Sequence, residues 1–138
     1  MTTHVPRYHR STHREAVLGF VRDRRAHLSA EEIYAGLRPN HPRLSMGTVY
    51  RNLHILVEQQ RLHALHFSNG GDRYDARLEP HYHLACRRCG DVVDVDMPVL
   101  DRLDTFVRDH RGSFRIESHT VLFHGLCLAC TQFERDVD

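Results

Sequence analysis

Residues 81–90, HYHLACRRCG, place two histidines and two cysteines in one short stretch. Both residue types are transition-metal ligands, and a tetrahedral zinc ion needs only four of them in one place. The stretch could therefore belong to one metal site or contribute to two. The spacing of the other cysteines decides between these possibilities.

The four cysteines form two Cys-x-x-Cys pairs, Cys86 with Cys89 and Cys127 with Cys130. Each pair has the spacing at which a tight turn brings both sulfur atoms to one ion. Four thiolates make a closed tetrahedral site for zinc or for iron of the rubredoxin kind. Because no coordination position stays open, we expect a structural role, joining the C-terminal strand to the strand before the second half's helix. A thioredoxin-like redox role is disfavoured, since neither pair is predicted to open a helix after a strand.

His81 and His83 then predict a second metal site. Residues two apart in an extended strand point to the same face, so both imidazoles can reach one ion. Asp75 lies six residues before His81, and Asp94 follows the first cysteine pair, so a local sheet could gather all four ligands. The alternative interpretation is a solvated His-Tyr-His edge in a chain that contains 13 histidines.

Length and composition limit the class of protein. A chain of 138 residues that is 41% hydrophobic forms one ordinary domain or two small ones. No apolar run is long enough to span a bilayer, and the N-terminal MTTHVPRYHR lacks the hydrophobic segment of a secretory signal. We therefore expect a cytoplasmic protein without a membrane partner, in a compartment that keeps thiols reduced.

The charge is distributed unevenly along the chain. Residues 1–74 contain eleven arginines and six acidic residues, whereas residues 75–138 contain eight arginines and twelve acidic residues. This asymmetry indicates that the first half faces nucleic acid.

Three amphipathic helices are predicted in the first half. Apolar residues recur at helical spacing in residues 14–23. Ser29, followed three residues later by Glu32, has the form of a capping box, so a second helix begins there. Ser45 has the position of the N-cap of a third helix. The residues expected to be buried are Val17, Phe20, Val21, Ile33, Leu37, Val49, Leu53 and Leu56.

A hairpin is predicted after these helices. Two short strand-like runs in residues 61–75 flank Asn69-Gly70-Gly71-Asp72, residues that tolerate the positive φ of a tight turn. Three helices and a hairpin follow the order of a winged helix, although an arbitrary small α+β domain has the same elements. The basic charge favours the DNA-binding interpretation.

The second half has a different pattern. Short strands are predicted in residues 84–86 and 91–96, followed by a helix over 98–110 whose Leu100, Leu103 and Val107 share a face. A strand-like segment, residues 114–125, closes the fold. The boundary between the halves is expected near residues 74–80.

Five stretches resemble one known family. AHLSAEEIY, SMGTVYRNL, RYD, HYHLACRRCGDVVD and HGLCLAC occur in this order between about Arg10 and Cys130. They are similar to the ferric uptake regulator (Fur) superfamily of metal-dependent bacterial repressors. The resemblance implies an α+β protein with a winged-helix DNA-binding domain, residues 1–76, and a small α/β dimerisation domain, residues 77–138. It also implies a structural zinc on the four cysteines.

The resemblance adds a fifth ligand to the predicted histidine site. His27 matches the family position that joins Asp75, His81, His83 and Asp94 around a regulatory ion. Because ligands come from both domains, binding would fix the angle between them. In a homodimer that angle sets the distance between two recognition helices on a palindromic operator.

The resemblance also implies which residues contact DNA. In the third helix, Tyr50 would pack on base edges or thymine methyl groups and Arg51 would bind phosphate. Ser45 and Thr48 would donate from the helix N-terminus, and Arg14 matches a position near the backbone or minor groove. The alternative for Tyr50 is partial burial in the core beside Val49.

The regulatory ligands bear on the metal. Three imidazoles and two carboxylates suit Fe(II) or Mn(II) without excluding Zn(II). Asp94, where iron sensors usually have Glu, resembles the peroxide-sensing and manganese-sensing branches. In the peroxide-sensing branch, bound iron reacts with peroxide and a ligating histidine is oxidised, which releases DNA. Asp101 and His119 resemble ligands of a further site, but Pro80 and Tyr82 occupy its other positions, so we expect it to be absent or incomplete.

Two alternatives have different functions. A zinc hydrolase or deaminase could use His81 and His83, but the chain has neither HxE followed by PCxxC nor HExxH, so we expect no enzyme. A zinc-uptake regulator of the same superfamily tends to have a cysteine in its sensor site, and every cysteine here is already assigned. We therefore expect a repressor that responds to iron, manganese or peroxide.

Overall fold

The computed structural model describes residues 11–24, 26–67, 71–108, 112 and 114–136. The chain divides into two compact units, residues 1–78 and 79–138. Helices and strands occur in both units, which confirms the predicted α+β class. Within the described ranges, no helix is both long enough and apolar enough to cross a membrane.

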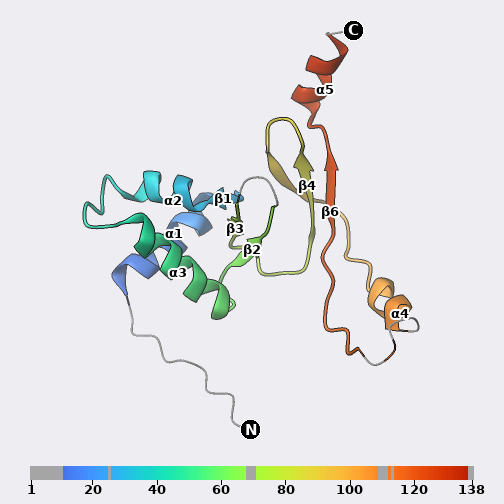
Figure 1. The fold of residues 1–138 in the computed structure, drawn as a ribbon, viewed down its shortest axis with the longest axis horizontal. Helices are drawn as coiled ribbons and strands as arrows, with labels where there is room; N and C mark the ends of the chain where they lie inside the picture. The colour runs from blue at the N-terminus through green and yellow to red at the C-terminus, as the bar shows by residue number, and fades with distance from the viewer. Residues whose placement is uncertain (1–10, 25, 68–70, 109–111, 113, 137–138) are drawn as a thin grey trace. The chain divides into compact units, whose positions relative to one another are not determined.

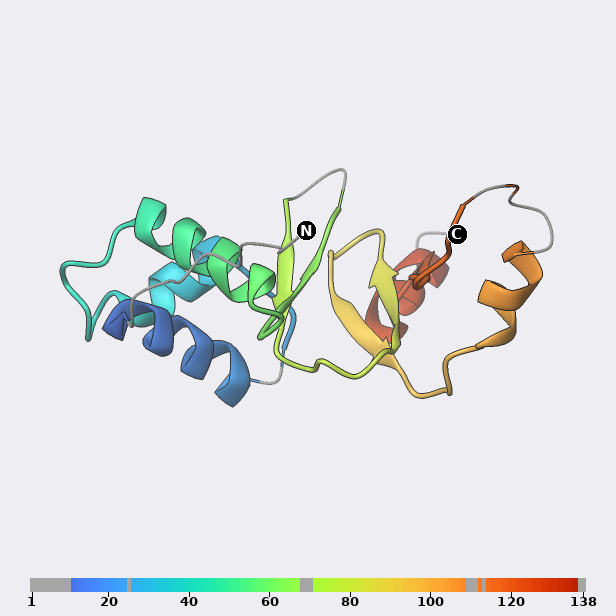
Figure 2. The same cartoon turned by 90° about the horizontal axis from the view of Figure 1, so that it is seen from below.

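The first unit contains the three predicted helices, α1 (Thr12–Arg24), α2 (Ala30–Leu37) and α3 (Met46–Glu58). They pack together beside a small sheet (Figure 1, Figure 2). The capping box is confirmed, because the Glu32 amide donates to Ser29 Oγ at 3.2 Å and the Ser29 amide donates to Glu32 Oε2 at 3.4 Å.

The sheet of the first unit has three short strands, β1 (Leu28–Ser29), β2 (His63–Leu65) and β3 (Arg73–Asp75). Their order is β1-β3-β2, and both neighbouring pairs are antiparallel. The predicted hairpin therefore corresponds to β2 and β3. The predicted turn residues Asn69 and Gly70 lie outside the described residues, and Gly71 has the positive φ of 73° that favours glycine.

The core of the first unit lies between its helices and the sheet. All the first-unit residues predicted to be buried are buried except Phe20, which is half-buried and packs against the core. The prediction missed Leu18 and Ala30 within the helices, and helical periodicity could not identify the contributions from connecting segments and from β3. The buried apolar residues are Val17, Leu18, Val21, Ala30, Ile33, Leu37, Leu44, Val49, Leu53, Leu56, Leu62 and Tyr74.

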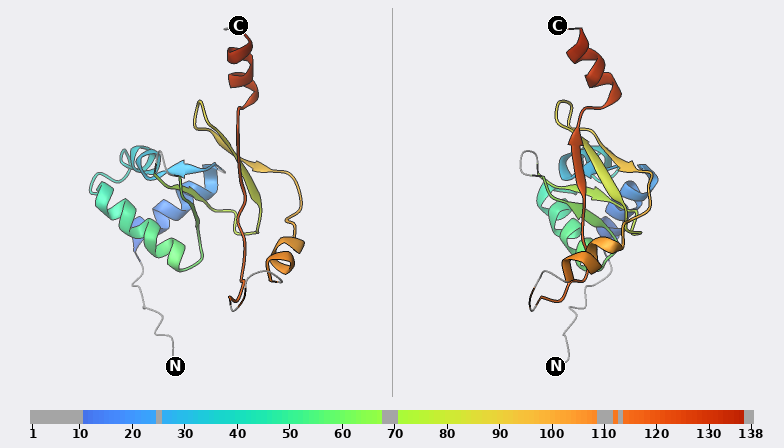
Figure 3. Two further views of the ribbon diagram at one scale, coloured as in Figure 1. Left: turned by 45° about the vertical axis from the view of Figure 1, so that its right-hand side comes forward. Right: turned by 90° about the vertical axis from the view of Figure 1, so that its right-hand side faces the viewer.

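The second unit is built around β4 (Tyr82–Cys86), which lies between β5 (Val92–Val95) and β6 (Leu122–Gly125). β5 pairs with β4 in antiparallel orientation and β6 in parallel orientation. The helix α4 (Arg102–Arg108) separates β5 from β6 in sequence, and α5 (Leu128–Arg135) follows β6 directly (Figure 3).

Three details of the second unit differ from the prediction. Only Leu122–Gly125 of the expected strand 114–125 is a strand, because its pairing with β4 covers only those positions. The apolar face expected on α4 is not buried within one chain, where Leu103 is 38% and Val107 43% exposed. The helix α5 was not predicted, and Cys127 at its N-cap makes no side-chain capping hydrogen bond that would have signalled it.

Candidate metal centres and DNA-reading helix

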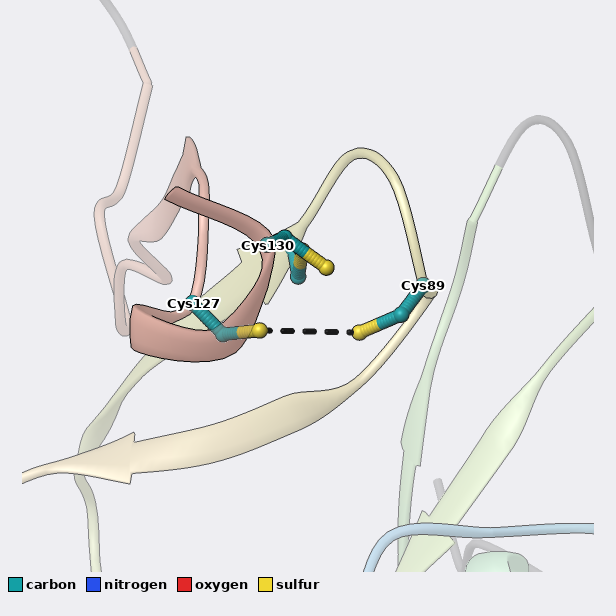
Figure 4. A group of neighbouring side chains, drawn as sticks. Cys89, Cys127 and Cys130 are labelled. Carbon is teal, nitrogen blue, oxygen red and sulfur yellow. Dashed lines mark hydrogen bonds between the residues drawn. The ribbon is translucent and has the colours of Figure 1, made fainter. Parts of the chain in front are cut away.

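The four cysteines come together within the second unit. Cys86 ends β4, Cys89 lies in the turn before β5, Cys127 caps α5 and Cys130 lies in its first turn. Their sulfur atoms all lie within 4.8 Å of one another. The Sγ atoms of Cys89 and Cys127 are 3.8 Å apart (Figure 4). All four are free thiols, so the geometry is that of a metal site rather than of disulfides.

The protein environment acts differently on the individual thiols. Hydrogen bonds from the backbone amides of Cys89 and Cys127 lower the pKa of Cys86 to about 6. The hydrogen bond with the Cys127 side chain, followed by burial, raises the pKa of Cys130 to about 12. Negatively charged sulfur atoms at these distances repel one another, and a divalent cation between them would offset the repulsion. Four sulfur ligands also leave no open position, which fits structural zinc.

The position of Cys127 overturns the argument used against a redox role. Cys127 and Cys130 lie at the start of α5, directly after β6, whereas the sequence predicted no helix after a strand at either cysteine pair. The error follows from the missed helix α5. A metal site remains the better interpretation, because these two sulfur atoms share one cluster with Cys86 and Cys89.

The second unit also brings together His81, His83 and Asp94. His83 and Asp94 are directly paired across β4 and β5. Asp94 Oδ1 lies 3.1 Å from His81 Nε2 and 3.5 Å from His83 Nε2. His81 Nδ1 is 2.6 Å from the Glu79 carbonyl oxygen. Because a carbonyl only accepts, Nδ1 carries a proton, and Nε2, on the side of Asp94, is the ring nitrogen available to a metal ion.

The first unit brings together the other two predicted ligands, His27 and Asp75. His27 immediately precedes β1 and Asp75 ends β3, so the antiparallel pairing of these strands places both at the same end of the ladder. His27 Nε2 and Asp75 Oδ2 are 3.3 Å apart. Each unit thus presents an imidazole nitrogen next to a carboxylate, a donor combination that suits Fe(II) or Mn(II).

A hydrogen-bond chain occupies the region of the suspected further metal site. The buried Tyr82 hydroxyl accepts from the Leu100 amide at 2.9 Å and lies 2.6 Å from His119 Nε2. His119 Nδ1 is 2.9 Å from Asp104 Oδ1. In the neutral ring, Nδ1 donates to the carboxylate and Nε2 accepts from the tyrosine hydroxyl. The carboxylate next to His119 is thus Asp104, which spacing did not identify.

The helix α3 presents the residues predicted to read DNA. Ser45 Oγ accepts from the Thr48 amide at 3.1 Å and lies 2.9 Å from Thr48 Oγ1. Arg51 is exposed and Tyr50 is 47% exposed, whereas Val49 is fully buried. Tyr50 therefore lies at the surface and not in the core beside Val49.

Two further residues define this surface. The Tyr50 hydroxyl donates to Glu31 Oε1 at 2.8 Å, a contact that the sequence did not indicate because 19 positions separate the residues. Arg14, in α1, is only 8% exposed. The structure thus groups Ser45, Thr48, Tyr50 and Arg51 at one helix, whereas Arg14 lies on α1 and is buried.

Both the sequence and the structure of the chain are similar to those of known proteins. Residues 7–130 match the ferric uptake regulator family. The chain is 32% identical over 138 residues to the ferric uptake regulation protein of Bacillus subtilis, covering 96% of this chain and 92% of that protein. It is also 32% identical over 117 residues to the peroxide-responsive repressor PerR of Staphylococcus saprophyticus, covering 85% and 78%. The structure of the ferric uptake regulator of Helicobacter pylori, which has three functional metal-binding sites, superposes with a TM-score of 0.77 at 28% identity, covering 89% of this chain and 82% of that one.

Proposed function

The chain belongs to the ferric uptake regulator family of metal-dependent repressors, and we propose that it binds palindromic operator DNA as a homodimer when a regulatory ion is bound. The proposed regulatory ligands are His27, Asp75, His81, His83 and Asp94. The observation that carries this proposal is the imidazole–carboxylate cluster in each unit, His27 with Asp75 and His83 with Asp94.

A regulatory role needs ligands on both units. An ion held by residues of one unit alone would stabilise that unit without affecting the other. When bound, Mn(II) or Fe(II) would supply a shared positive centre for both clusters, so the angle between the units would depend on metal. Shifting such an equilibrium from 1:99 to 99:1 requires about 5.5 kcal/mol of differential binding, so the loss of a single ligand should weaken the response.

The four cysteines are the proposed structural zinc ligands. A zinc ion there would join the turn between β4 and β5 to the start of α5. The neighbouring Arg87, whose Nη2 is 2.8 Å from Glu134 Oε1 on α5, supports the same connection. We propose that this site maintains the second unit and does not take part in sensing.

The two predicted domains have separate proposed roles. Residues 1–76 would contact DNA through α3, with Tyr50 on bases, Arg51 on phosphate, and Ser45 and Thr48 at the helix N-terminus. Arg14 stays a predicted backbone contact, although burial leaves 8% of its surface to make one. Residues 77–138 would form the dimer, which is supported by apolar side chains exposed in a single chain. These include Leu100, Phe106, Phe114, Phe123, Leu128 and Phe133.

The proposed signal is peroxide or metal. Two relatives at the same identity, a peroxide-responsive repressor and a ferric uptake regulation protein, support both possibilities. A peroxide response is supported by Asp94, which resembles the peroxide-sensing branch and lies next to two histidines, of which His81 is a candidate for oxidation. A manganese-level or iron-level sensor is the second candidate, and a zinc-uptake regulator has no better support. We further propose that the protein works in the cytoplasm and has no catalytic turnover.

The test uses the full chain, with zinc retained and the regulatory metal removed. Duplexes are first selected from a random-sequence library on Mn(II)-loaded protein, and their affinity is then measured without metal, with Mn(II) and with anaerobic Fe(II). Peroxide is added to both loaded forms, and the histidines are examined by mass spectrometry. Loss of DNA with added oxygen on His27 or His81, in the iron form only, supports a peroxide sensor.

Other outcomes separate the alternatives. Metal-dependent binding without histidine oxidation would indicate a sensor of metal level. Binding that no metal changes would contradict the proposed regulatory site. His124→Ala is the control for the role of the ligand histidines. His124 is an exposed histidine of β6 outside the proposed ligand set, so its replacement should leave metal-dependent DNA binding unchanged.

A further inference from the structure

The exposed face of α3 is connected to the first turn of α2 by one hydrogen bond. The Tyr50 hydroxyl donates to Glu31 Oε1 at 2.8 Å. A hydroxyl that donates to a carboxylate makes a shorter and stronger hydrogen bond than one between neutral groups. The hydroxyl of Tyr50, whose ring is proposed to contact bases, is therefore already hydrogen-bonded to another residue of the protein.

Glu31 is well suited to hold another side chain. It lies in the first turn of α2, where its backbone amide, followed by the Tyr50 hydroxyl, lowers the pKa of its carboxyl group. The group is consequently a carboxylate at neutral pH and accepts hydrogen bonds only. The start of α2 is fixed by the Ser29 capping box, and Ser29 pairs with Arg73 between β1 and β3.

The Tyr50 hydroxyl itself is poorly suited to bind phosphate. The hydrogen bond to Glu31 is the main cause of the raised pKa of Tyr50, and the charges of Glu31 and Asp72 add to burial in the same direction. A hydroxyl next to carboxylates is a poor phosphate donor, because a phosphate that approached it would be repelled. The aromatic ring, with Tyr50 47% exposed, is the part of this side chain that remains for DNA.

We propose that Glu31 is a positioning residue for DNA reading, which holds the Tyr50 hydroxyl so that the ring packs on thymine methyl groups. The inference rests on the proposed DNA-binding role of α3 and adds a residue to it. Glu31 itself would not contact a base. Its effect would be on discrimination: a ring held at one end stays aimed at one base position, whereas a free ring can rotate away and lose that contact.

The experiment compares two duplexes on Mn(II)-loaded full-length protein. One is a duplex selected from a random-sequence library on the wild-type chain. The other is taken from a series of the same sequence, in each member of which a single thymine is replaced by deoxyuridine, a change that removes only the methyl group. The measured quantity is the ratio of the two affinities. For wild-type protein we expect a preference for thymine at one position or more of each half-site.

Three single variants and one double variant test the role of Glu31. Glu31→Ala should lower the thymine preference by roughly three- to tenfold, the scale of one surface hydrogen bond. Glu31→Gln should restore most of the preference, because the amide oxygen still accepts. Tyr50→Phe should lose as much as Glu31→Ala, and the double variant should lose no more than either, since both remove the same contact.

Controls distinguish positioning from charge. Glu58→Gln removes a carboxylate from α3 at its other end, so a change in affinity that it shares with Glu31→Gln is a general charge effect. Tyrosine NMR titration of the free protein gives a readout without DNA. The pKa of Tyr50 should be above its ordinary value in the wild-type protein and closer to it in Glu31→Ala.

Each negative result has a separate meaning. If no duplex is enriched by the wild-type protein, the proposed DNA-binding function is wrong, and this inference with it. If the protein binds a selected duplex but Glu31→Ala keeps the full thymine preference, only the inference is overturned. The same conclusion follows if deoxyuridine has no effect on wild-type binding, or if Tyr50 titrates normally in the free protein.

Discussion

His83 and Asp94 are direct cross-strand partners in the β4–β5 ladder, with Nε2 and Oδ1 3.5 Å apart. Side chains alternate between the two faces of a sheet, so a slip of one residue would turn one of the pair to the opposite face. The register of two short strands therefore determines whether this half of the proposed regulatory site exists.

Replacement of Asp94 tests that half of the site. Asp94→Ala removes the oxygen that lies near both His81 and His83, so Mn(II) affinity should fall by at least about tenfold. Calorimetric titration of the zinc-retaining protein measures it. His124→Ala, which removes an exposed imidazole, should bind like the wild type. Equal affinity in all three proteins would mean that Asp94 is not a ligand.

The cysteine cluster predicts a zinc ion that the second unit needs. Cys130→Ser removes one of four sulfur ligands, so the purified variant should contain much less than the one zinc per chain expected of the wild type. Because folding and binding of a structural zinc are coupled, thermal stability should fall as well. Zinc content by mass spectrometry and thermal unfolding followed by circular dichroism measure both. Arg88→Ala, an exposed change between Cys86 and Cys89, is the control.

Zinc affinity should also depend on pH. Thiols must lose their protons to bind, and the raised pKa of Cys130, about 12, means that its proton leaves only when zinc arrives. Affinity should therefore increase by at least about tenfold per pH unit between about pH 7 and about pH 8. Cys86, with a pKa of about 6, is already a thiolate in this range and adds no dependence. Competition with a chromophoric chelator measures the slope, and a flat profile would contradict the raised pKa.

Local features of the sequence predicted much of the fold. Ser29 and Ser45 mark helix starts because each satisfies an amide a few residues away. The alternation His81, Tyr82, His83 predicted which side chains share a face. Contacts between distant positions left no such signal, as with Tyr50 and Glu31 or His119 and Asp104, which lie 19 and 15 positions apart. Spacing patterns describe one element at a time, whereas these pairs depend on how elements pack.

The Tyr82 hydroxyl should contribute to the stability of the second unit. Tyr82→Phe would leave the Leu100 amide and His119 Nε2 without this partner, and the loss of a hydrogen bond at a residue only 2% exposed should cost about 1–3 kcal/mol of unfolding free energy. Urea unfolding measures the change. Tyr34→Phe in α2, where the ring lies 5.6 Å from the Arg38 guanidinium carbon, is the control and should cost less. A variant as stable as the wild type would mean that water replaces the hydrogen bonds of the Tyr82 hydroxyl.

The two helix caps should differ in their effect on DNA binding. Ser29→Ala and Ser45→Ala each remove a side chain that accepts a backbone amide, at the starts of α2 and α3, and each should cost about 1 kcal/mol of stability. Ser45 also lies on the proposed DNA-contacting helix, so its replacement should weaken operator binding beyond what the stability change explains. Thermal unfolding and duplex affinity, measured on both variants at a temperature where both are folded, separate the two effects. A Ser45→Ala variant that binds DNA as tightly as the wild type would place Ser45 outside the interface and limit its role to capping α3.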